Sequence, residues 1–380
     1  MTNFIKRLGV SKDLNFEEVS TSTELILKTA KELGITVKPI PYTGIFILNY
    51  KGITQHLHAQ PATSNTRTAI YCCKNKAITK VMLSNNKISV PKGYIITKKD
   101  KVSYWKSIYK SLSKPLVVKP TDSSLAFNVK ANITTQSDYL GAIRSIYKHY
   151  GNLNQDILVE EMFIGTEYRI IATNKKILGI MARVPANVIG DGKHTIKELV
   201  TIKNTHPWRG GEYALHKIEL GTLEKNYLKS NGWTLQSIPA KNEHVQLHDA
   251  STTNIDHGGD TIDFTNKVHA SVTKIVLKTM SSIPGLSWAG MDFFSKDITK
   301  KQNTSDYIVL EINTSPNIAW QEFPAIGPRR KIAFEYLKEI FPSLSTHSKP
   351  KTKSSKPIKH IDPVEILPIT LDYISPITSV

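Results

Sequence analysis

Residues Tyr307–Asn313 have the sequence YIVLEIN, an apolar run in which a carboxylate, Glu311, and an amide, Asn313, stand two positions apart. Side chains two residues apart on a strand point to the same face, so these polar groups project together while their apolar neighbours point the other way. Burying such a pair is costly unless another group uses it. The stretch therefore predicts a buried strand that contributes to a functional site.

A second strand-like run, WAGMDF at Trp288–Phe293, offers Asp292 as a third oxygen ligand. A few hard oxygen ligands that leave room for water and phosphate oxygens suit Mg²⁺, with Mn²⁺ as the alternative ion, rather than zinc. The 12 histidines are scattered, without the paired spacing of a zinc site. We predict that Asp292, Glu311 and Asn313 ligate a magnesium ion that is bound with a nucleotide.

The composition, 40% hydrophobic over 380 residues, is typical of a globular protein with two or three lobes. No apolar run approaches the ~18 residues of a membrane span, and Met1–Val10 has too short an apolar segment for a signal peptide, so we expect no membrane partner. The two cysteines, Cys72 and Cys73, are adjacent, and neighbouring residues rarely form a stable disulfide. We interpret them as half-buried residues of a strand in a protein of the reducing cytoplasm.

The net charge of +18 favours anionic partners such as ATP, acidic substrates or nucleic acid. The tail from Ser343 onward contributes only +2, with five lysines against three acids, so the excess lies in the folded part. Aromatic residues are not interleaved with basic ones as in proteins that bind single strands. We therefore expect a basic surface with an ATP cleft and no nucleic-acid partner.

Residues 14–90, after an N-terminal extension at 1–13, have the pattern of a small αβ unit. Apolar residues recur with helical spacing in Thr23–Leu33, and Gly34 follows where a C-cap glycine belongs. The other elements expected here are two strands, Ile35–Ile40 and Gly44–Tyr50, and a helix, Lys76–Asn85.

Helix and strand patterns then alternate up to residue 342. The runs Tyr168–Ala172 and Lys176–Arg183 predict a β-hairpin around Asn174, which indicates an antiparallel sheet. The other expected elements are helices at Tyr104–Ser113, Gln136–Tyr150, His269–Ser281 and Arg330–Ile340, and strands at Pro115–Pro120 and Asp156–Met162. We divide this region into two lobes, about 91–175 and about 176–342, and expect a Lys/Ser/Pro-rich linker and a tail at 343–380.

Three segments have residues suited to a nucleotide site. Lys119 ends a strand, where a point cation can bind phosphate. Lys80 lies on the expected helix Lys76–Asn85. The run Ile157–Glu167, ILVEEMFIGTE, resembles a hinge whose backbone pairs with a purine and whose carboxylate accepts ribose hydroxyls. Arg183 begins a stretch that ends in a tight turn at His194, and an arginine there could stabilise a developing charge. The alternatives are solvated lysines, a strand ending in exposed acids and a structural turn.

Together these residues resemble the ATP-grasp superfamily, and most closely the ATP-grasp module of cyanophycin synthetase and of bifunctional glutathione synthetases. The resemblance extends over about 21–342. Its most specific parts are Arg183–Ala186 with Gly190–Thr195, Gly258–Asp260 followed by Asp263, Glu311–Asn313, and the run from Phe323 to Pro342 with Gly327, Arg329 and Arg330.

The resemblance implies an α+β fold in which two αβ lobes with antiparallel sheets clasp ATP, preceded by a small N-terminal αβ unit, the pre-ATP-grasp domain. It implies that Lys80 and Lys119 reach the phosphates together with Ser123 and Ser124 of the phosphate loop, that Glu160 and the backbone of Glu161 and Phe163 hold adenine, and that Glu167 holds the ribose. Arg183 and Lys119 are the expected catalytic residues. The expected substrate-binding residues are Asn187, His194, His257, Arg329 and Arg330.

Two departures from the family pattern concern the loop and the substrate pocket. The phosphate-covering loop at 121–129 contains no glycine, although close approach of backbone N–H groups to phosphate favours glycine. Asp256-His257 stands where the relatives have Ser-Thr, which predicts a different substrate pocket. The resemblance does not extend to the partner domains that these enzymes carry, a Mur-ligase-like domain in one and a glutamate–cysteine ligase domain in the other.

The implied activity is that of a Mg·ATP-dependent, ADP-forming carboxylate–amine ligase. A carboxylate would attack the γ-phosphate to give an acyl phosphate, and an amine would then displace phosphate. The expected substrates are an amino acid or short peptide and an amine, and a homo-oligomer is left open. The alternatives are an ATP-grasp phosphotransferase and a non-catalytic relative that binds nucleotide or nucleic acid.

Overall fold

The computed structural model describes residues 20–41, 43–58, 64–122, 128–151, 155–206, 209–210, 215–248 and 258–344. Several predicted features lie outside these ranges and are not judged by the structure. They are the extension at 1–13, the loop residues Ser123 and Ser124, His257 and nearly all of the tail at 343–380.

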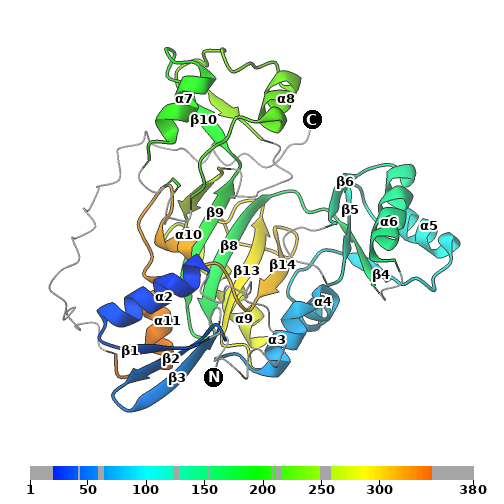
Figure 1. The fold of residues 1–380 in the computed structure, drawn as a ribbon. Helices are drawn as coiled ribbons and strands as arrows, with labels where there is room; N and C mark the ends of the chain where they lie inside the picture. Colours follow the sequence, from blue (N-terminus) through cyan, green and yellow to red (C-terminus); the bar gives the residue numbers. More distant parts are fainter. Residues whose placement is uncertain are drawn as a thin grey trace, which may run out of the picture.

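A five-stranded antiparallel sheet forms the centre of the molecule (Figure 1). Its hairpin of β8 (Thr166–Thr173) and β9 (Ile177–Val184) is the hairpin predicted around Asn174. The strands lie in the order β12-β9-β8-β13-β14, with β12 at Asp260–Asp263, β13 at Trp288–Ser295 and β14 at Tyr307–Asn313. We call this the large sheet.

The two faces of the large sheet differ in chemistry. Along β8, the side chains of Tyr168, Ile170 and Ala172 point into the main hydrophobic core, so Glu167 and Arg169, which alternate with them, point to the opposite face. The alternation predicted for β14 is confirmed in the same way, because Ile312 lies in this core between Glu311 and Asn313. The face of the large sheet opposite the main core is therefore polar at one end, and we call this its polar face.

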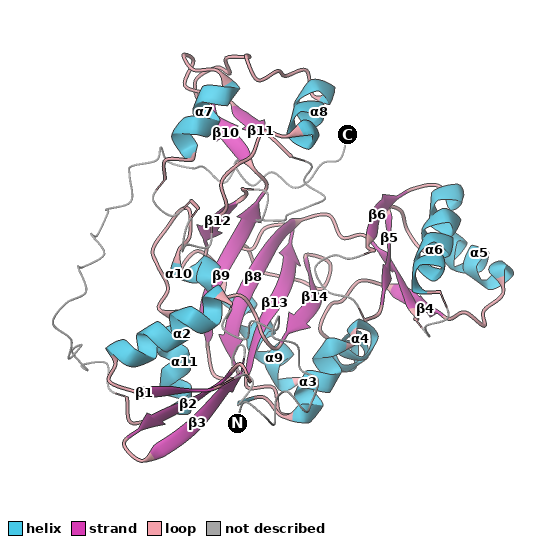
Figure 2. Cartoon of the chain, in the orientation of Figure 1, coloured by secondary structure: helices cyan, strands magenta, loops and turns pink. Residues whose placement is uncertain are grey.

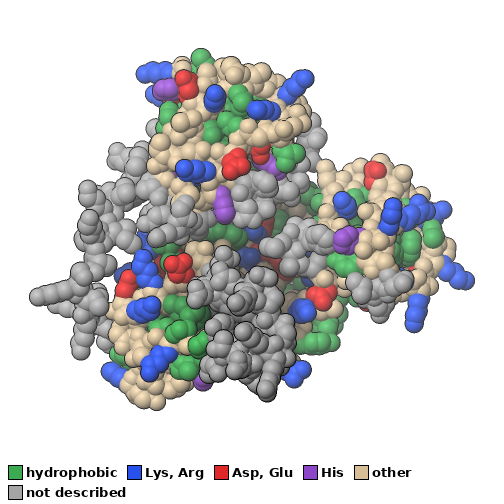
Figure 3. Space-filling view, in the orientation of Figure 1, with side chains coloured by type: hydrophobic (Ala, Val, Ile, Leu, Met, Phe, Trp, Pro, Cys, Tyr) green, Lys and Arg blue, Asp and Glu red, His purple; other side chains and the backbone are tan. Residues whose placement is uncertain are grey.

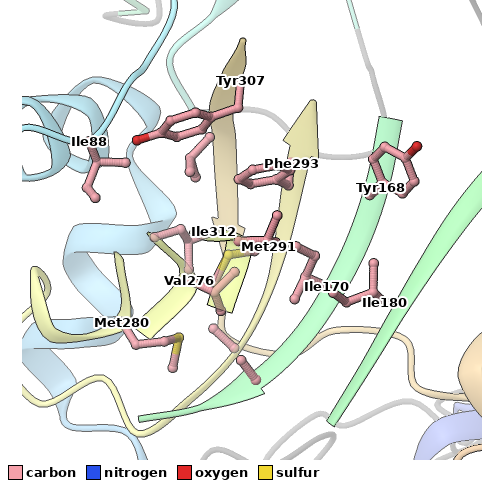
Figure 4. Packing of buried hydrophobic residues seen from close by; sticks show 14 of the residues in the cluster. Ile88, Tyr168, Ile170, Ile180, Val276, Met280, Met291, Phe293, Tyr307 and Ile312 are labelled. Atoms are coloured by element: carbon pink, nitrogen blue, oxygen red, sulfur yellow. The ribbon is translucent and has the colours of Figure 1, made fainter. Parts of the chain in front are cut away.

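Helices cover the apolar face of the large sheet. Val276 and Met280 of α9 (Ala270–Ser281) lie in one cluster with Met291 and Phe293 of β13, as Figure 4 shows. The same cluster includes residues from α3 (Arg67–Lys74) and α4 (Lys76–Asn85). This packing holds the polar face in a fixed position.

The prediction of a strand at Cys72 and Cys73 is wrong, because both lie in α3 and are buried. The side chain of Thr66 caps this helix by accepting the N–H of Ala69 at 3.2 Å. The buried residues, Ala69, Cys72 and Cys73, have the i, i+3, i+4 spacing of a helix face, so the helical signal was present in the sequence.

A four-stranded antiparallel sheet, the small sheet, forms the lobe on the right of Figure 2. Its order is β4-β7-β5-β6, with β4 at Gly93–Ile96, β5 at Leu116–Pro120, β6 at Lys130–Ile133 and β7 at Ile157–Glu161. Helices α5 (Val102–Ser111) and α6 (Gln136–Tyr150) pack on it around Ile143, Ile146 and Val118.

The expected lobe boundary near residue 175 falls inside the β8–β9 hairpin. Because both strands of that hairpin belong to the large sheet, the chain passes from the small to the large sheet between β7 and β8. Residues 14–90 are also divided in their packing. Helix α2 (Thr21–Glu32) and strands β1 (Thr36–Ile40), β2 (Ile45–Tyr50) and β3 (Ile53–His58) share a core with α11 (Ile332–Ile340), whereas α3 and α4 join the main core.

A third unit follows β9 and lies at the top of Figure 1. It contains β10 (Asn187–Ile189) paired with β11 (His244–Gln246), and helices α7 (Ile196–Lys203) and α8 (Thr222–Ser230) around their own small core. Lys and Arg side chains are spread over all three lobes on the face that Figure 3 shows. Within the described residues, no helix is both long and apolar enough to cross a membrane.

Candidate active site

The three predicted metal ligands meet on the polar face of the large sheet. Asp292 on β13 is the register partner of Glu311 on β14, and Gly290 is the partner of Asn313. The Asn313 amide donates to Glu311 Oε1 at 3.4 Å. Gly290 is required here, because a Cβ at this position would lie 2.5 Å from the Pro316 side chain.

The two carboxylates have different surroundings. Burial would raise the pKa of Asp292, but Arg169 and Arg183 hold it below its ordinary value. The pKa of Glu311 is raised by burial and by Asp292, against the weaker opposing effects of Lys76 and Arg169. The nearby cations therefore do not fully compensate the negative charge of Glu311, and a further cation would stabilise it.

The donor set fits a hard divalent cation. Two carboxylates and an amide oxygen are ligands that Mg²⁺ accepts, and the raised pKa of Glu311 is the effect that a bound cation would relieve. Among the described residues, no three or more His, Cys, Asp and Glu side chains are grouped so that they could hold a metal ion, and the third side-chain ligand expected here is the Asn313 amide. Such a site suits a metal bound together with phosphate.

Two arginines flank the carboxylates. Arg169 Nη1 lies 3.0 Å from Asp292 Oδ1, and Arg183 Nη2 lies 3.3 Å from the same oxygen. Arg183 also forms an ion pair with Glu167, the residue expected to hold ribose. The guanidinium of Arg183 lies 5.9 Å from the ring of Trp320 on α10 (Ala319–Glu322). Arg183 thus lies beside the metal ligands, as a residue that stabilises charge should.

The expected phosphate lysines, Lys80 and Lys119, both contact Glu160. Lys80 Nζ lies 2.6 Å from Glu160 Oε1, and Lys119 Nζ lies 2.7 Å from Glu160 Oε2. Burial would raise the pKa of Glu160, but the two lysines hold it below its ordinary value. Burial lowers the pKa of Lys80 to about 8, and Glu160 opposes that shift while Lys119 adds to it.

Lys76 lies close to Glu311 and also interacts with Lys119 and Glu160. The sequence did not identify it as a site residue. Its Nζ lies 3.9 Å from Glu311 Oε2, and its side chain is 11% exposed. Burial lowers its pKa, Glu311 raises it, and Lys119 lowers it further. The available signal was the spacing of Lys76 and Lys80, which stand four apart on one helix face.

Arg169 was missed as well. It follows Glu167 by two residues on β8, so it lies on the same face of the strand, and it is the register partner of Asp292. Its side chain is buried and its pairing with Asp292 crosses from β8 to β13.

The segment expected to receive adenine connects the two sheets. The backbone of Glu161 was expected to contact a purine; its N–H donates to the Lys92 carbonyl at 2.9 Å, and the Glu161 carboxylate accepts the Ser113 N–H at 2.9 Å. Gly165 is required by the turn into β8, because a Cβ there would lie 2.7 Å from both Phe163 and the Ser295 carbonyl. Of the backbone groups expected to hold adenine, the Glu161 N–H is therefore already used within the protein.

Two of the expected substrate residues are occupied by internal contacts. The Asn187 amide donates to Asp260 Oδ2 at 3.0 Å, and Lys203 Nζ donates to Asn187 Oδ1 at 2.9 Å. Arg330 Nε donates to Asp263 Oδ1 at 2.9 Å, and its Nη2 pairs with the other oxygen. We therefore assign Asn187 and Arg330 to structural networks, since a partner distant in the sequence already satisfies each side chain.

Arg329 and His194 are more open. Arg329 is 41% exposed, lies over the Phe323 ring and donates from Nε to the Glu322 carbonyl at 2.7 Å. His194 Nδ1 lies 2.5 Å from Asp191 Oδ2, and this hydrogen bond raises the pKa of His194. Asp191 also accepts two backbone N–H groups, which is the contact pattern of the structural turn considered above.

No protein-family model matches the chain. The glutathione biosynthesis bifunctional protein of Clostridium perfringens is 31% identical over 334 residues, which are 86% of this chain and 42% of that protein. The cyanophycin synthetase of Trichormus variabilis is 28% identical over 324 residues, 85% of this chain and 35% of that protein. The chain thus spans less than half the length of these relatives.

A solved structure shares the fold. The crystal structure of a bifunctional glutathione synthetase from Pasteurella multocida matches with a TM-score of 0.70 and 28% identity, covering 87% of this chain and 45% of that one. The ATP-grasp fold expected from the sequence, and the resemblance to these two kinds of enzyme, are confirmed.

Proposed function

We propose that this chain, which has the ATP-grasp fold, is a Mg·ATP-dependent, ADP-forming carboxylate–amine ligase that acts on an amino acid or short peptide and an amine. One observation carries the proposal: oxygen ligands and lysines converge where the small sheet meets the large sheet. They are Asp292, Glu311 and Asn313 on one side and Lys76, Lys80 and Lys119 on the other. The similarity to glutathione and cyanophycin synthetases supports the same reaction class.

The lysines supply the charge that ATP phosphates need. Lys80 and Lys119 share the single carboxylate of Glu160, and Lys76 Nζ lies 3.9 Å from Glu311 Oε2. The group therefore has an excess of positive charge in a region shielded from water, where electrostatic attraction is strong. Lys80, Lys119 and Lys76 are our candidates for direct phosphate contact.

The carboxylates and the amide would hold Mg²⁺, which neutralises charge that develops on the transferred phosphoryl group. In the first step the substrate carboxylate attacks the γ-phosphate, forming an acyl phosphate and ADP. In the second step the amine attacks the acyl carbon and phosphate leaves. The site residues hold the reactants close together and exclude water, which would hydrolyse the acyl phosphate.

Arg183 is our candidate for charge stabilisation in both steps. Its Nη2 lies beside Asp292, so the guanidinium is held at the metal ligands, and its buried Nε has no hydrogen-bond partner in the part of the chain that the structure describes. A donor held in place before the reaction stabilises developing negative charge without reorganisation. Arg329, half exposed, is the candidate for a substrate carboxylate.

The test is phosphate release from Mg·ATP across a matrix of amino acids, dipeptides and amines, with mass spectrometry of each active mixture. Release that requires two substrates, together with an amide product, is the expected result. A stable phosphorylated product would establish a phosphotransferase instead. ATP binding without turnover in any mixture would favour a binding protein, and steep salt dependence of binding to DNA or RNA would identify a nucleic-acid partner.

The two cysteines support a proposal for the location of the protein. Cys72 and Cys73 are free and buried, and we propose a cytoplasmic location in which they stay reduced.

A further inference from the structure

Glu160 is the most enclosed ionisable group of the site. Its side chain is 1% exposed, and each of its oxygens contacts one lysine. Its side chain is packed so closely that only glycine fits at its register partner on β4, Gly93. A Cβ at Gly93 would lie 2.9 Å from Glu160 Cγ and 2.3 Å from the Val159 carbonyl oxygen. A side chain so enclosed by protein groups is poorly placed to bind a purine.

The contacts of Glu160 join three elements. Glu160 lies on β7 and Lys119 on β5, which are neighbouring strands of the small sheet. Lys80 lies on α4, which packs against the large sheet, and its Nζ also donates to the Leu310 carbonyl of β14 at 3.2 Å. Glu160 and Lys80 together therefore fasten the small sheet to the strand that presents Glu311.

The charges around Glu160 explain why a carboxylate is needed there. The groups that act on Lys80 are Glu160 from β7, Lys119 from β5 and Glu311 from β14. Lys76, on the same helix, is influenced by Lys119 and Glu160 as well. Without Glu160, buried ammonium groups would face one another, and at least one would lose its proton or move away.

We propose that Glu160 is a positioning residue for the phosphate-binding lysines: its two carboxylate oxygens hold Lys80 and Lys119 in place, and it does not bind adenine. This inference rests on the ATP site of the proposed function. The family resemblance implied that Glu160 contacts adenine. Our proposal is instead that Glu160 contributes to ATP binding through the lysines that bind the phosphates.

The first test compares ATP, ADP, AMP and GTP binding to wild type and Glu160→Gln by calorimetry. The expected result is about 10- to 100-fold weaker ATP binding, the loss typical of a charged hydrogen-bond partner, with AMP binding and the ATP-to-GTP preference unchanged. Equal losses for ATP and AMP, or a relaxed preference for ATP over GTP, would show that Glu160 contacts the base. Glu335→Gln is the matched control, because Glu335 pairs with Lys176 on the surface.

The second test uses pH. Because Glu160 raises the pKa of Lys80, Glu160→Gln lowers it further, so ATP binding to the variant should strengthen as pH falls from 8 towards 6. Wild type should change less over that range, because Lys80, with a pKa of about 8, is half protonated at pH 8 and mostly protonated by pH 7. Parallel pH profiles for the two proteins would overturn the proposal, since a merely structural role would not shift the profile.

A third measurement is independent of ATP. Titration of Lys80 by NMR after ¹³C-methylation of the lysines should show a lower pKa in Glu160→Gln than in wild type. If wild type binds no ATP, the proposed function fails, and this measurement still decides whether Glu160 controls Lys80. If Glu160→Gln does not fold, Glu160→Gln with Lys80→Met should fold, because it removes both members of the pair, and a double variant that is no more stable than the single one would contradict the coupling.

Discussion

Asp292 and Glu311 are register partners on adjacent strands, yet the pKa values of their carboxyl groups are shifted in opposite directions. Arg169 and Arg183 both contact Asp292, whereas the nearest cation to Glu311 is Lys76, at 3.9 Å. The site thus holds one carboxylate that is already compensated and one that a cation would compensate. At the proposed metal site, a proton and a metal ion would therefore compete for Glu311.

This competition predicts that Mn²⁺ binding, measured by electron paramagnetic resonance with ATP present, weakens as pH falls through the raised pKa of Glu311. Glu311→Gln should remove that pH dependence and lower phosphate release by about 100-fold or more, because the metal loses a charged ligand. Asp297→Asn is the control, because the Asp297 carboxylate accepts from the Thr299 hydroxyl at 2.6 Å and pairs with Lys300 at 3.2 Å. Full activity of Glu311→Gln would refute the metal assignment.

The same variant should not lose stability. A carboxyl group whose folded pKa is raised contributes stability below its unfolded pKa of about 4.5, and this contribution is lost as pH rises through the folded pKa. At neutral pH, Glu311→Gln therefore removes a repulsion with Asp292, and its melting temperature should equal or exceed that of wild type. Lower activity with an unchanged melting temperature would separate the chemistry from folding.

The sequence predicted local structure well wherever one periodicity dominated. The strand Tyr307–Asn313 and the helices Lys76–Asn85 and Gln136–Tyr150 have the expected bounds, and the three metal ligands meet because strand alternation places them on one face. Cys72 was misassigned because a short apolar run has the composition of a strand, although its spacing was helical.

The pairings could not be predicted, because they join residues that are distant in the chain. Lys203 and Asp260 are 57 residues apart, and Asp263 and Arg330 are 67 apart. A motif shows that Asn187 or Arg330 has a role, but only the fold shows whether a partner already occupies the side chain. Register also revealed Arg169, whose importance depends on lying opposite Asp292.

Glu322 should make stability depend on pH. Burial raises its pKa to about 7, against the opposing hydrogen bond from the Ala333 N–H and the charge of Arg329. The folded state therefore binds the proton more tightly, and the free energy of unfolding should fall as pH rises from about 4.5 to about 7, by up to roughly 3 kcal/mol. Urea denaturation at pH 5 and pH 8 should show this difference in wild type and a smaller one in Glu322→Gln. Equal differences would assign the pH effect to other groups.

Arg330 and Arg329 provide a matched pair for the structural assignment. Arg330→Met should lower the free energy of unfolding by about 3–5 kcal/mol, because Asp263 is left buried without its bidentate partner. Arg329→Met should cost less than about 1 kcal/mol, since Arg329 is 41% exposed and lies 3.7 Å from Glu322, and should instead raise KM for the carboxylate substrate. The reverse pattern would mean that Arg330 binds substrate. Arg330→Met with Asp263→Asn should recover part of the stability.

Lys76 gives the sharpest distinction between the phosphate and metal parts of the site. Lys76→Met should weaken ATP binding by about 10-fold, because a charged contact is lost where little water competes. It should also raise the pKa of Glu311, which Lys76 lowers, so the acidic limb of the pH profile of kcat/KM should move to higher pH. Lys74→Met is the control. Lys74 stands one residue before the Asn75 cap, its side chain is 73% exposed, and its ion pair with Asp122 is long, at 3.8 Å. A loss of ATP binding without movement of the acidic limb would place Lys76 with the phosphates alone, and no effect on either would exclude it from the site.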